Sequence, residues 1–257
     1  MTPPAPWSPF HIILSLLGLA WSVCLTRLLC RKYSSGDFQG SGTGADRAAF
    51  ILWTCGLILA ASELYKQLFL YQVVNNGRYD WWYFPFQLCS TPMYLCLVYP
   101  LLPQGRPRKA AAVYLQSFGF LGGVMALLEP SGLMHPYWTL TLHGLLWHVM
   151  LIFIGLFVTA SGLADRNLRS FLWTLPLFWV FCLTATAVNI LTGGLADMFY
   201  ISPYYPVTQA VFHEISLAAG ILPGIAVYLI SICVGAALCR LLLNRLYPER
   251  ENFPGTL

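Results

Sequence analysis

Seven apolar stretches, each about the length needed to cross a bilayer, follow one another along the 257-residue chain. A helix rises about 1.5 Å per residue, so about 20 apolar residues cross a hydrocarbon core of ~30 Å. The stretches are residues 10–30, 48–74, 82–102, 110–128, 137–161, 171–191 and 217–243. They predict an all-α, polytopic membrane protein, folded as one seven-transmembrane-helix bundle over residues 1–257.

The composition agrees with a chain that is solvated mostly by lipid. Hydrophobic residues make up 58% of it and charged residues 9%, with a mean hydropathy of +0.65. A soluble domain carries roughly one-quarter charged residues. The net charge of +4 is small, and it lies on alternate loops, so it indicates orientation in a membrane and no nucleic-acid partner.

Positive charge alternates between the two ends of the predicted bundle. Twelve of the fourteen lysines and arginines fall around the first, third and fifth loops and in the C-terminal tail: Arg27, Arg31, Lys32, Arg47, Arg106, Arg108, Lys109, Arg166, Arg169, Arg240, Arg245 and Arg250. Cytoplasmic loops carry such an excess. We therefore expect the N-terminus outside or in a lumen and the C-terminus in the cytosol. The chain would reside in the endoplasmic reticulum or another endomembrane, or in the plasma membrane.

Two side chains with complementary chemistry are predicted at the same depth below the outer face. Cys89 lies about two turns into the third stretch, and His143 lies about two turns into the fifth. An imidazole can accept the proton of a thiol and so produce a thiolate nucleophile. Pro85 and Pro92 flank Cys89 and remove backbone donors from the helix, which can free other backbone N–H groups for an oxyanion.

Other polar groups in the outer half are candidates for substrate binding, because such groups are costly in lipid. Glu63 and Lys66 lie three residues apart on one predicted helical face, which favours a mutual ion pair and leaves open a polar lining of a cavity. The remaining candidates are Gln87, Asn189, Asp197 and His213. The loop that contains Asp197 is rich in aromatic residues and proline, which suggests a re-entrant cap.

A metal site is a less favoured alternative. His143 and His148 are five residues apart, about 140° around a helix, and cannot act as an i, i+4 metal pair. A zinc ion would have to recruit His213 and a carboxylate from elsewhere. We therefore assign no metal ligands and no cofactor.

Several short motifs follow one another between about Glu63 and Ile230. They are FPFQLCSTPMYLC around Cys89, GGVMALLEPSG, YWTLTLHGLLWH with His143, Asn189, and ADMFYISPYYP before His213. In this order they resemble the YwaF-like integral membrane family, in its transmembrane protein 164 acyltransferase branch. The resemblance implies a seven-helix fold and cysteine-dependent acyl transfer onto lysophospholipids, including ether-linked phosphatidylethanolamine.

The resemblance implies that Cys89 is the family's cysteine and that His143 and Asn189 are its histidine and asparagine. The chain has Gln87 and Ser90 where relatives carry a histidine beside the cysteine, and Ala196 and Asp197 where an Asn-Tyr pair is usual. Because no histidine neighbours Cys89 in the sequence, His143 is the expected proton acceptor.

The expected function is acyl transfer between glycerophospholipids through a thioester at Cys89, with phospholipids and lysophospholipids as partners. Gln87 or Asn189 would support the oxyanion or the head group. Two alternatives remain: a non-catalytic seven-helix lipid-binding receptor or transporter, and a metal-dependent intramembrane hydrolase. A rhodopsin-like receptor is disfavoured, because no Asp-Arg-Tyr ends the third stretch and no Asn-Pro-x-x-Tyr ends the seventh.

Overall fold

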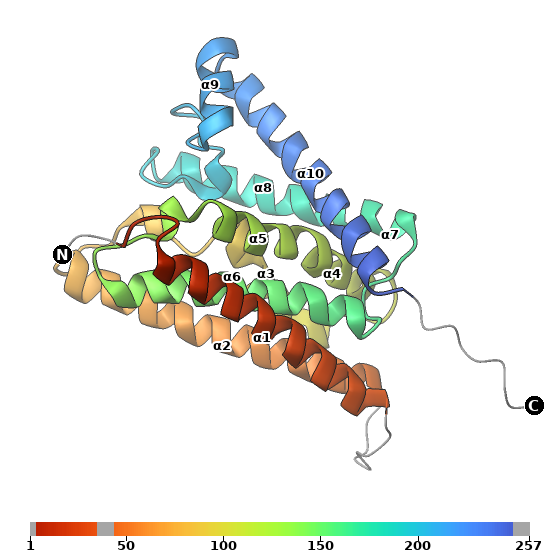
Figure 1. Ribbon diagram of the computed structural model, residues 1–257. Helices are drawn as coiled ribbons and strands as arrows, with labels where there is room; N and C mark the ends of the chain where they lie inside the picture. The colour runs from red at the N-terminus through yellow and green to blue at the C-terminus, as the bar shows by residue number, and fades with distance from the viewer. Residues whose placement is uncertain (1–3, 35–43, 249–257) are drawn as a thin grey trace, which may run out of the picture.

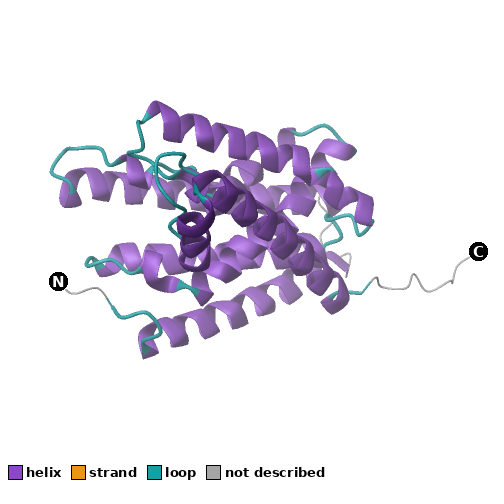
Figure 2. Cartoon of the chain, turned by 90° about the horizontal axis from the view of Figure 1, so that it is seen from above, coloured by secondary structure: helices purple, strands orange, loops and turns teal. Residues whose placement is uncertain are grey.

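The computed structural model describes residues 4–34 and 44–248, and within these ranges it is helical without a β-strand. Figure 1 shows the long helices running between the two ends of one bundle, and Figure 2 shows the loops gathered at those ends. The α-helices are α1 (Pro9–Ser34), α2 (Gly44–Phe69), α3 (Thr91–Val98), α4 (Arg106–Tyr114), α5 (Phe120–Leu128), α6 (Trp138–Ala160), α7 (Leu168–Leu172), α8 (Thr174–Leu191), α9 (Ala210–Ala219) and α10 (Ile221–Leu246).

Six helical segments of the described chain are long and apolar enough to cross a membrane. They are Pro9–Arg31, Asp46–Val74, Arg106–Leu128, Trp138–Ala160, Leu168–Leu191 and Ile221–Leu246. Each corresponds to one of the predicted stretches. The first is the least covered by protein, with 11% of its apolar window buried, so α1 presents most of its surface to lipid.

The third predicted stretch, 82–102, is the exception, because only its second part is a helix. The apolar helical segment here is Leu88–Leu101, about 21 Å long at 1.5 Å per residue. The 3-10 turn η2 (Trp81–Tyr83) and the residues around Pro85 precede it. Pro85 and Pro92 explain the late start, because proline cannot donate a backbone hydrogen bond within a helix.

The short helix α3 lies inside the bundle. Cys96 is fully buried and Tyr99, just after α3, is almost so. A Cβ atom added at Gly56 of α2 would stand 2.8 Å from the backbone nitrogen of Leu97, so the two helices meet at this glycine. A helix that is covered by protein on several sides need not match the full thickness of the hydrocarbon core.

The most buried long helices are the α4–α5 segment and α6. The former is continuous through a π-helical insertion, η5 (Leu115–Gly119). Phe118 in this insertion stacks on Tyr114 and Phe178, with ring centroids 4.9 and 4.7 Å apart. π-Helical turns are rare in proteins overall, and those that occur are often found at functional sites.

Part of the loop between α8 and α9 is buried in the protein instead of lying on its surface. Residues Ala196, Asp197, Met198 and Phe199 are each at most 1% exposed. The short helix α9 follows and leads through Gly220, at φ +102°, into α10. The loop therefore packs into the protein, and the hydrogen bonds between Gln87 and the backbone of Asp197 and Phe199 place it beside the segment that contains Cys89. That it re-enters the membrane stays a prediction, and we call it the re-entrant loop.

Candidate active site

A cavity of about 210 Å³ lies near the end of the bundle at which α6 begins. Five predicted site residues line it: Glu63, Lys66, Gln87, Cys89 and His143. They belong to α2, to the turns before α3 and to α6. The volume corresponds to about seven water molecules, which suits the ester group of a lipid better than a whole lipid.

Cys89 lies in the 3-10 turn η3 (Leu88–Ser90), directly before α3. Its carbonyl oxygen accepts a hydrogen bond of 3.0 Å from the indole Nε1 of Trp147 on α6. Gly122 of α5 packs behind it, since a Cβ there would stand 3.7 Å from the Cys89 Cα. The side chain of Ser90 is a hydrogen-bond partner of the sulfur. A hydroxyl donor is of the kind that stabilises negative charge on sulfur.

His143 faces the same cavity from the first turns of α6. Its ring packs against Trp147, four residues on, with centroids 5.6 Å apart. The imidazole is hydrogen-bonded to the backbone of Ser62 on α2. Its Nε2 atom is buried and has no hydrogen-bond partner in the described chain. A buried imidazole nitrogen without a partner is expected to have one in a ligand or in the reaction.

His148 also lines the cavity, which sequence reasoning did not anticipate. Its Nδ1 atom lies 2.6 Å from the carbonyl oxygen of Gly144. A carbonyl oxygen can only accept, so Nδ1 carries the hydrogen and the Nε2 of the neutral ring keeps its lone pair. Residues five apart on a helix differ by about 140°, and His143 and His148 therefore flank the side of α6 that faces the cavity.

Glu63 and Lys66 form the predicted ion pair, with 2.7 Å between Oε1 and Nζ. Gln67 donates hydrogen bonds of 2.7 Å to Glu63 Oε1 and to the carbonyl oxygen of Tyr83. Gln67 thus connects the ion pair on α2 to the turn η2, which precedes the Cys89 segment. Both charged residues line the cavity, so the ion pair and the polar lining, proposed as alternatives, occur together.

Two amide side chains fix the re-entrant loop through its backbone. Gln87 accepts from the Phe199 N–H at 2.8 Å and donates to the Asp197 carbonyl at 2.7 Å. Asn189 accepts from the Met198 N–H at 2.6 Å and donates to the Met198 carbonyl at 3.1 Å. Asn189 does not line the cavity, whereas Gln87 does. In this structure each amide holds protein backbone with both of its ends.

The remaining predicted residues are Asp197, within the loop, and His213, on α9. Asp197 is 1% exposed and accepts from the Ser202 N–H at 3.0 Å and from the Thr208 hydroxyl at 3.4 Å. Burial raises the pKa of its carboxyl to about 6. His213, on α9, has its Nδ1 atom 3.1 Å from the carbonyl oxygen of Val207. Neither side chain lines the cavity.

The model of the TMEM164 family matches residues 6–243, which include every one of these residues. The chain belongs to the TMEM164 family. Searches of curated proteins and of solved structures returned no match. Together with its six long apolar helices, the family membership identifies the chain as a multi-pass membrane protein.

In this TMEM164 family member the re-entrant loop contributes a cavity residue that the sequence did not single out, Tyr200. Phe199 and Tyr200 have φ of 59° and 57°, a left-handed conformation that is costly for bulky side chains and clusters at functional sites. The Gln87 bond to the Phe199 N–H helps to hold it. Positive φ cannot be read from a MFYI sequence, so Tyr200 carried no signal.

His135, in the loop before α6, also lines the cavity. Its Nδ1 accepts a hydrogen bond from the Tyr137 N–H at 3.1 Å, so the neutral ring carries its hydrogen on Nε2. Burial lowers the pKa of His135 below its ordinary value. Within residues 4–34 and 44–248 of this family member, no three His, Cys, Asp or Glu side chains are grouped so as to hold a metal ion.

Proposed function

We propose that the chain is a cysteine-dependent acyltransferase that moves an acyl chain between glycerophospholipids through a thioester at Cys89. The observation that carries the proposal is the shared cavity of Cys89 and His143, in which the Nε2 atom of His143 is buried without a hydrogen-bond partner in the described chain. A thiol, a base and donors for charge are the parts that acyl transfer through a covalent intermediate requires.

The first half-reaction forms the thioester. His143 takes the proton of the Cys89 thiol, and the thiolate sulfur attacks the carbonyl carbon of a phospholipid ester. The carbon–sulfur bond forms as the ester carbon–oxygen bond breaks. His143 returns the proton to the departing lysophospholipid oxygen.

The second half-reaction reverses these steps on another molecule. The hydroxyl of an acceptor lysophospholipid gives its proton to His143 and attacks the thioester carbon. The new ester bond forms as the carbon–sulfur bond breaks, and the thiolate regains a proton. Bonds and protons balance over the cycle without a cofactor, and water must be excluded to keep the thioester from hydrolysis.

We also propose that the chain crosses the membrane seven times, with α3 and the turns before it as the third crossing. The start of α1 and the end of α10 lie at opposite ends of the bundle in Figure 1, as an odd number of crossings requires. Arg27, Arg31, Lys109 and Arg166 line one pocket at the end where α10 finishes. The positive-inside rule assigns that end to the cytosol and the Cys89 cavity to the outer half.

The experiment that tests the function is acyl transfer by the purified full chain in lipid nanodiscs. A phospholipid with an isotope-labelled acyl chain is the donor, lysophosphatidylethanolamine is the acceptor, and the products are measured by mass spectrometry. We expect Cys89→Ser to lose nearly all transfer, because a serine hydroxyl is much harder to ionise than a thiol. Cys233→Ser is the matched control: Cys233 is half-buried on α10 and does not line the cavity.

Full transfer by a well-folded Cys89→Ser protein excludes the thioester. If neither the wild type nor Cys89→Ser transfers acyl chains while both bind lysophospholipid, the cavity belongs to a lipid-binding receptor or transporter.

A further inference from the structure

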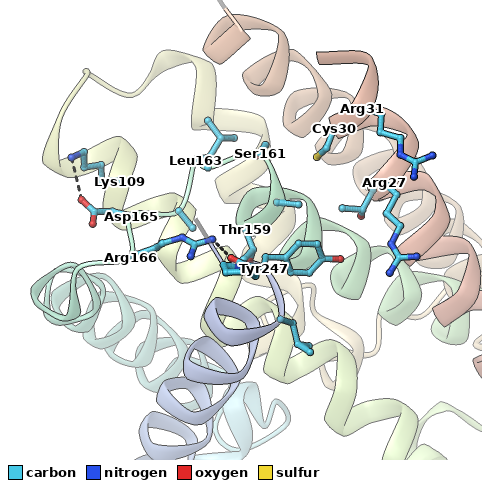
Figure 3. Close-up of a pocket in the computed structure, with 16 residues that line it drawn as sticks. Arg27, Cys30, Arg31, Lys109, Thr159, Ser161, Leu163, Asp165, Arg166 and Tyr247 are labelled. Atoms are coloured by element: carbon cyan, nitrogen blue, oxygen red, sulfur yellow. Dashed lines mark hydrogen bonds and ion pairs between the residues drawn. The ribbon is translucent and has the colours of Figure 1, made fainter. Parts of the chain in front are cut away.

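A second and larger cavity, of about 820 Å³, lies at the opposite end of the bundle. Thr159 of α6 lines it, eleven residues beyond His148, which lines the Cys89 cavity, so the two cavities are separated by roughly 17 Å along that helix. Figure 3 shows Arg27 and Arg31 on one side of this cavity and Lys109 and Arg166 on the other, with Tyr247 between them. We call it the basic cavity.

The charges of the basic cavity are not balanced. Among its described lining residues, four are cationic and one, Asp165, is acidic. Asp165 is paired with Lys109 at 3.1 Å. Arg166 donates a hydrogen bond to the backbone carbonyl of Tyr247, which leaves its charge unpaired. Arg27 and Arg31, four residues apart on α1, are exposed and have no ion pair within the described chain.

A buried arginine that does not itself line the cavity is hydrogen-bonded to the backbone of a lining residue. Arg240 is 1% exposed and donates to the carbonyl oxygens of Asp165 and Asn167, both at 2.7 Å, and to Gln116 Oε1 at 3.4 Å. All three acceptors are neutral. Gln116 in turn donates to the hydroxyl of Thr159, which lines the cavity. Arg240 is therefore solvated by dipoles and forms no ion pair in the described chain, and the carboxylate of Asp165 attracts it only at longer range.

Two hydroxyl groups of the lining are buried without a partner. Thr26 is fully buried, and its Oγ1 atom has no hydrogen-bond partner in the described chain. The Oγ atom of Ser161 is also buried and unpartnered. Most buried polar atoms in proteins have a hydrogen-bond partner, so an oxygen-rich ligand in this cavity would supply an acceptor for both hydroxyl groups.

The surroundings favour a lipid over a soluble anion. Leu246, 61% exposed, lines the cavity, and Leu28, 63% exposed, follows Arg27 on α1. These apolar side chains offer a surface for acyl chains next to the cationic groups. Basic pockets at the cytoplasmic side of transmembrane helices bind anionic lipid head groups in this way.

We propose that the basic cavity is a binding site for the phosphate of an anionic phospholipid, distinct from the Cys89 cavity. Arg27, Arg31 and Arg166 bind the phosphate oxygens, and the hydroxyls of Thr26 and Ser161 donate to them. The proposal does not depend on acyl transfer, because its readout is lipid binding.

Native mass spectrometry of the full chain in detergent tests it, with phosphatidylinositol 4-phosphate, phosphatidylserine and phosphatidylcholine as probes. The wild type should retain phosphatidylinositol 4-phosphate most strongly and phosphatidylcholine least. Arg27→Gln with Arg31→Gln should weaken binding of phosphatidylinositol 4-phosphate roughly 30-fold, and Thr26→Val roughly fivefold. Thermal unfolding and gel filtration of each variant confirm that it is folded.

The matched control is Arg169→Gln with Arg245→Gln, which removes the same charge from the same end at exposed residues outside the cavity. Its binding should change less than threefold. An equal loss in the control would show diffuse attraction to a basic surface and overturn the site. So would equal retention of phosphatidylcholine. Displacement of the lipid by inorganic phosphate at low millimolar concentration would identify a site for small anions and overturn the lipid assignment.

Discussion

At the scale of the residue, the Cys89 cavity contains two histidines with different surroundings. The Nδ1–H of His148 is held by the Gly144 carbonyl, which orients the ring. The Nε2 of His143 is buried and unpartnered. The ring of His143 is likewise hydrogen-bonded, to the backbone of Ser62 on α2, so the two residues differ in the buried, unpartnered Nε2 atom of His143, which can accept the proton of the thiol or of the substrate hydroxyl.

This difference predicts the behaviour of a His143→Gln variant. Loss of a general base costs typically 10²–10⁴-fold, and we expect a loss of roughly that size at pH 7. Transfer should recover partly at high pH, where the thiol ionises without a base. The rate of acyl transfer as a function of pH measures this. A variant whose pH profile is parallel to that of the wild type would mean that His143 does not act as the base.

The Glu63–Lys66 ion pair allows a prediction about stability. Glu63→Gln leaves the Lys66 ammonium without its partner in a mostly buried position, and we expect a loss of about 1–3 kcal/mol. The double variant Glu63→Gln with Lys66→Gln should lose less, because no unpaired charge remains. Thermal unfolding in detergent compares the two. Equal melting temperatures for the single and double variants would indicate that water already solvates the cavity.

At the scale of the element, the re-entrant loop contributes Tyr200 to the cavity and is held by two amides. Gln87 and Asn189 each exchange two hydrogen bonds with its backbone. The sequence suggested that these amides contact substrate, and the structure gives them the additional task of positioning the loop. Asp197 closes the loop from within through Ser202 and Thr208.

Asp197 gives the loop a pH dependence. Its pKa is raised from 3.8 to about 6, so the folded state holds the proton more tightly than the unfolded state. Its contribution to stability is full below pH 4 and is lost as the pH rises through 6. Asp197→Asn removes this titration, and it should raise stability at pH 7.5 by about 1–3 kcal/mol. Melting temperatures from pH 4.5 to 7.5 test it, and an unchanged slope in the variant would contradict it.

At the scale of the whole molecule, the orientation of the chain decides which leaflet the Cys89 cavity faces. A glycosylation acceptor inserted after Gly77 should be modified in cells, and one inserted after Gln104 should not. The same experiment with an acceptor after Gly162 should also give no modification. Modification after Gln104 or Gly162 would invert the topology and place the cavity in the cytosolic half.

The hydropathy of the sequence predicts most of the long helices of the fold. Six of the seven apolar stretches became long helices, because about 20 apolar residues have few other ways to satisfy their backbone in lipid. Residues 82–102 differ because prolines 85 and 92 delay the helix, and burial inside the bundle tolerates the shorter length. Periodicity could not show this, since a protein-covered helix and a lipid-facing helix are equally apolar.

The cavity residues that could be predicted are those whose depth in the membrane follows from their position in an apolar stretch. Those that depend on turns of the backbone could not be predicted. Cys89 and His143 were expected at one depth and line one cavity. Tyr200 and His148 were missed. Tyr200 reaches the cavity through the left-handed backbone at residues 199 and 200. His148 reaches it because a broad side of α6, from His143 to His148, lines the cavity. Both follow from packing between segments, on which local sequence carries no information.

If Cys89 carries the acyl group, intact-protein mass spectrometry of the chain after incubation with a donor phospholipid should detect it. We expect a mass increase of one acyl group, located at Cys89, released by hydroxylamine or by lysophospholipid, and absent from Cys89→Ser but present in Cys233→Ser. An acyl transfer that proceeds without any adduct at Cys89 under rapid quenching, or an adduct that persists in Cys89→Ser, would contradict it.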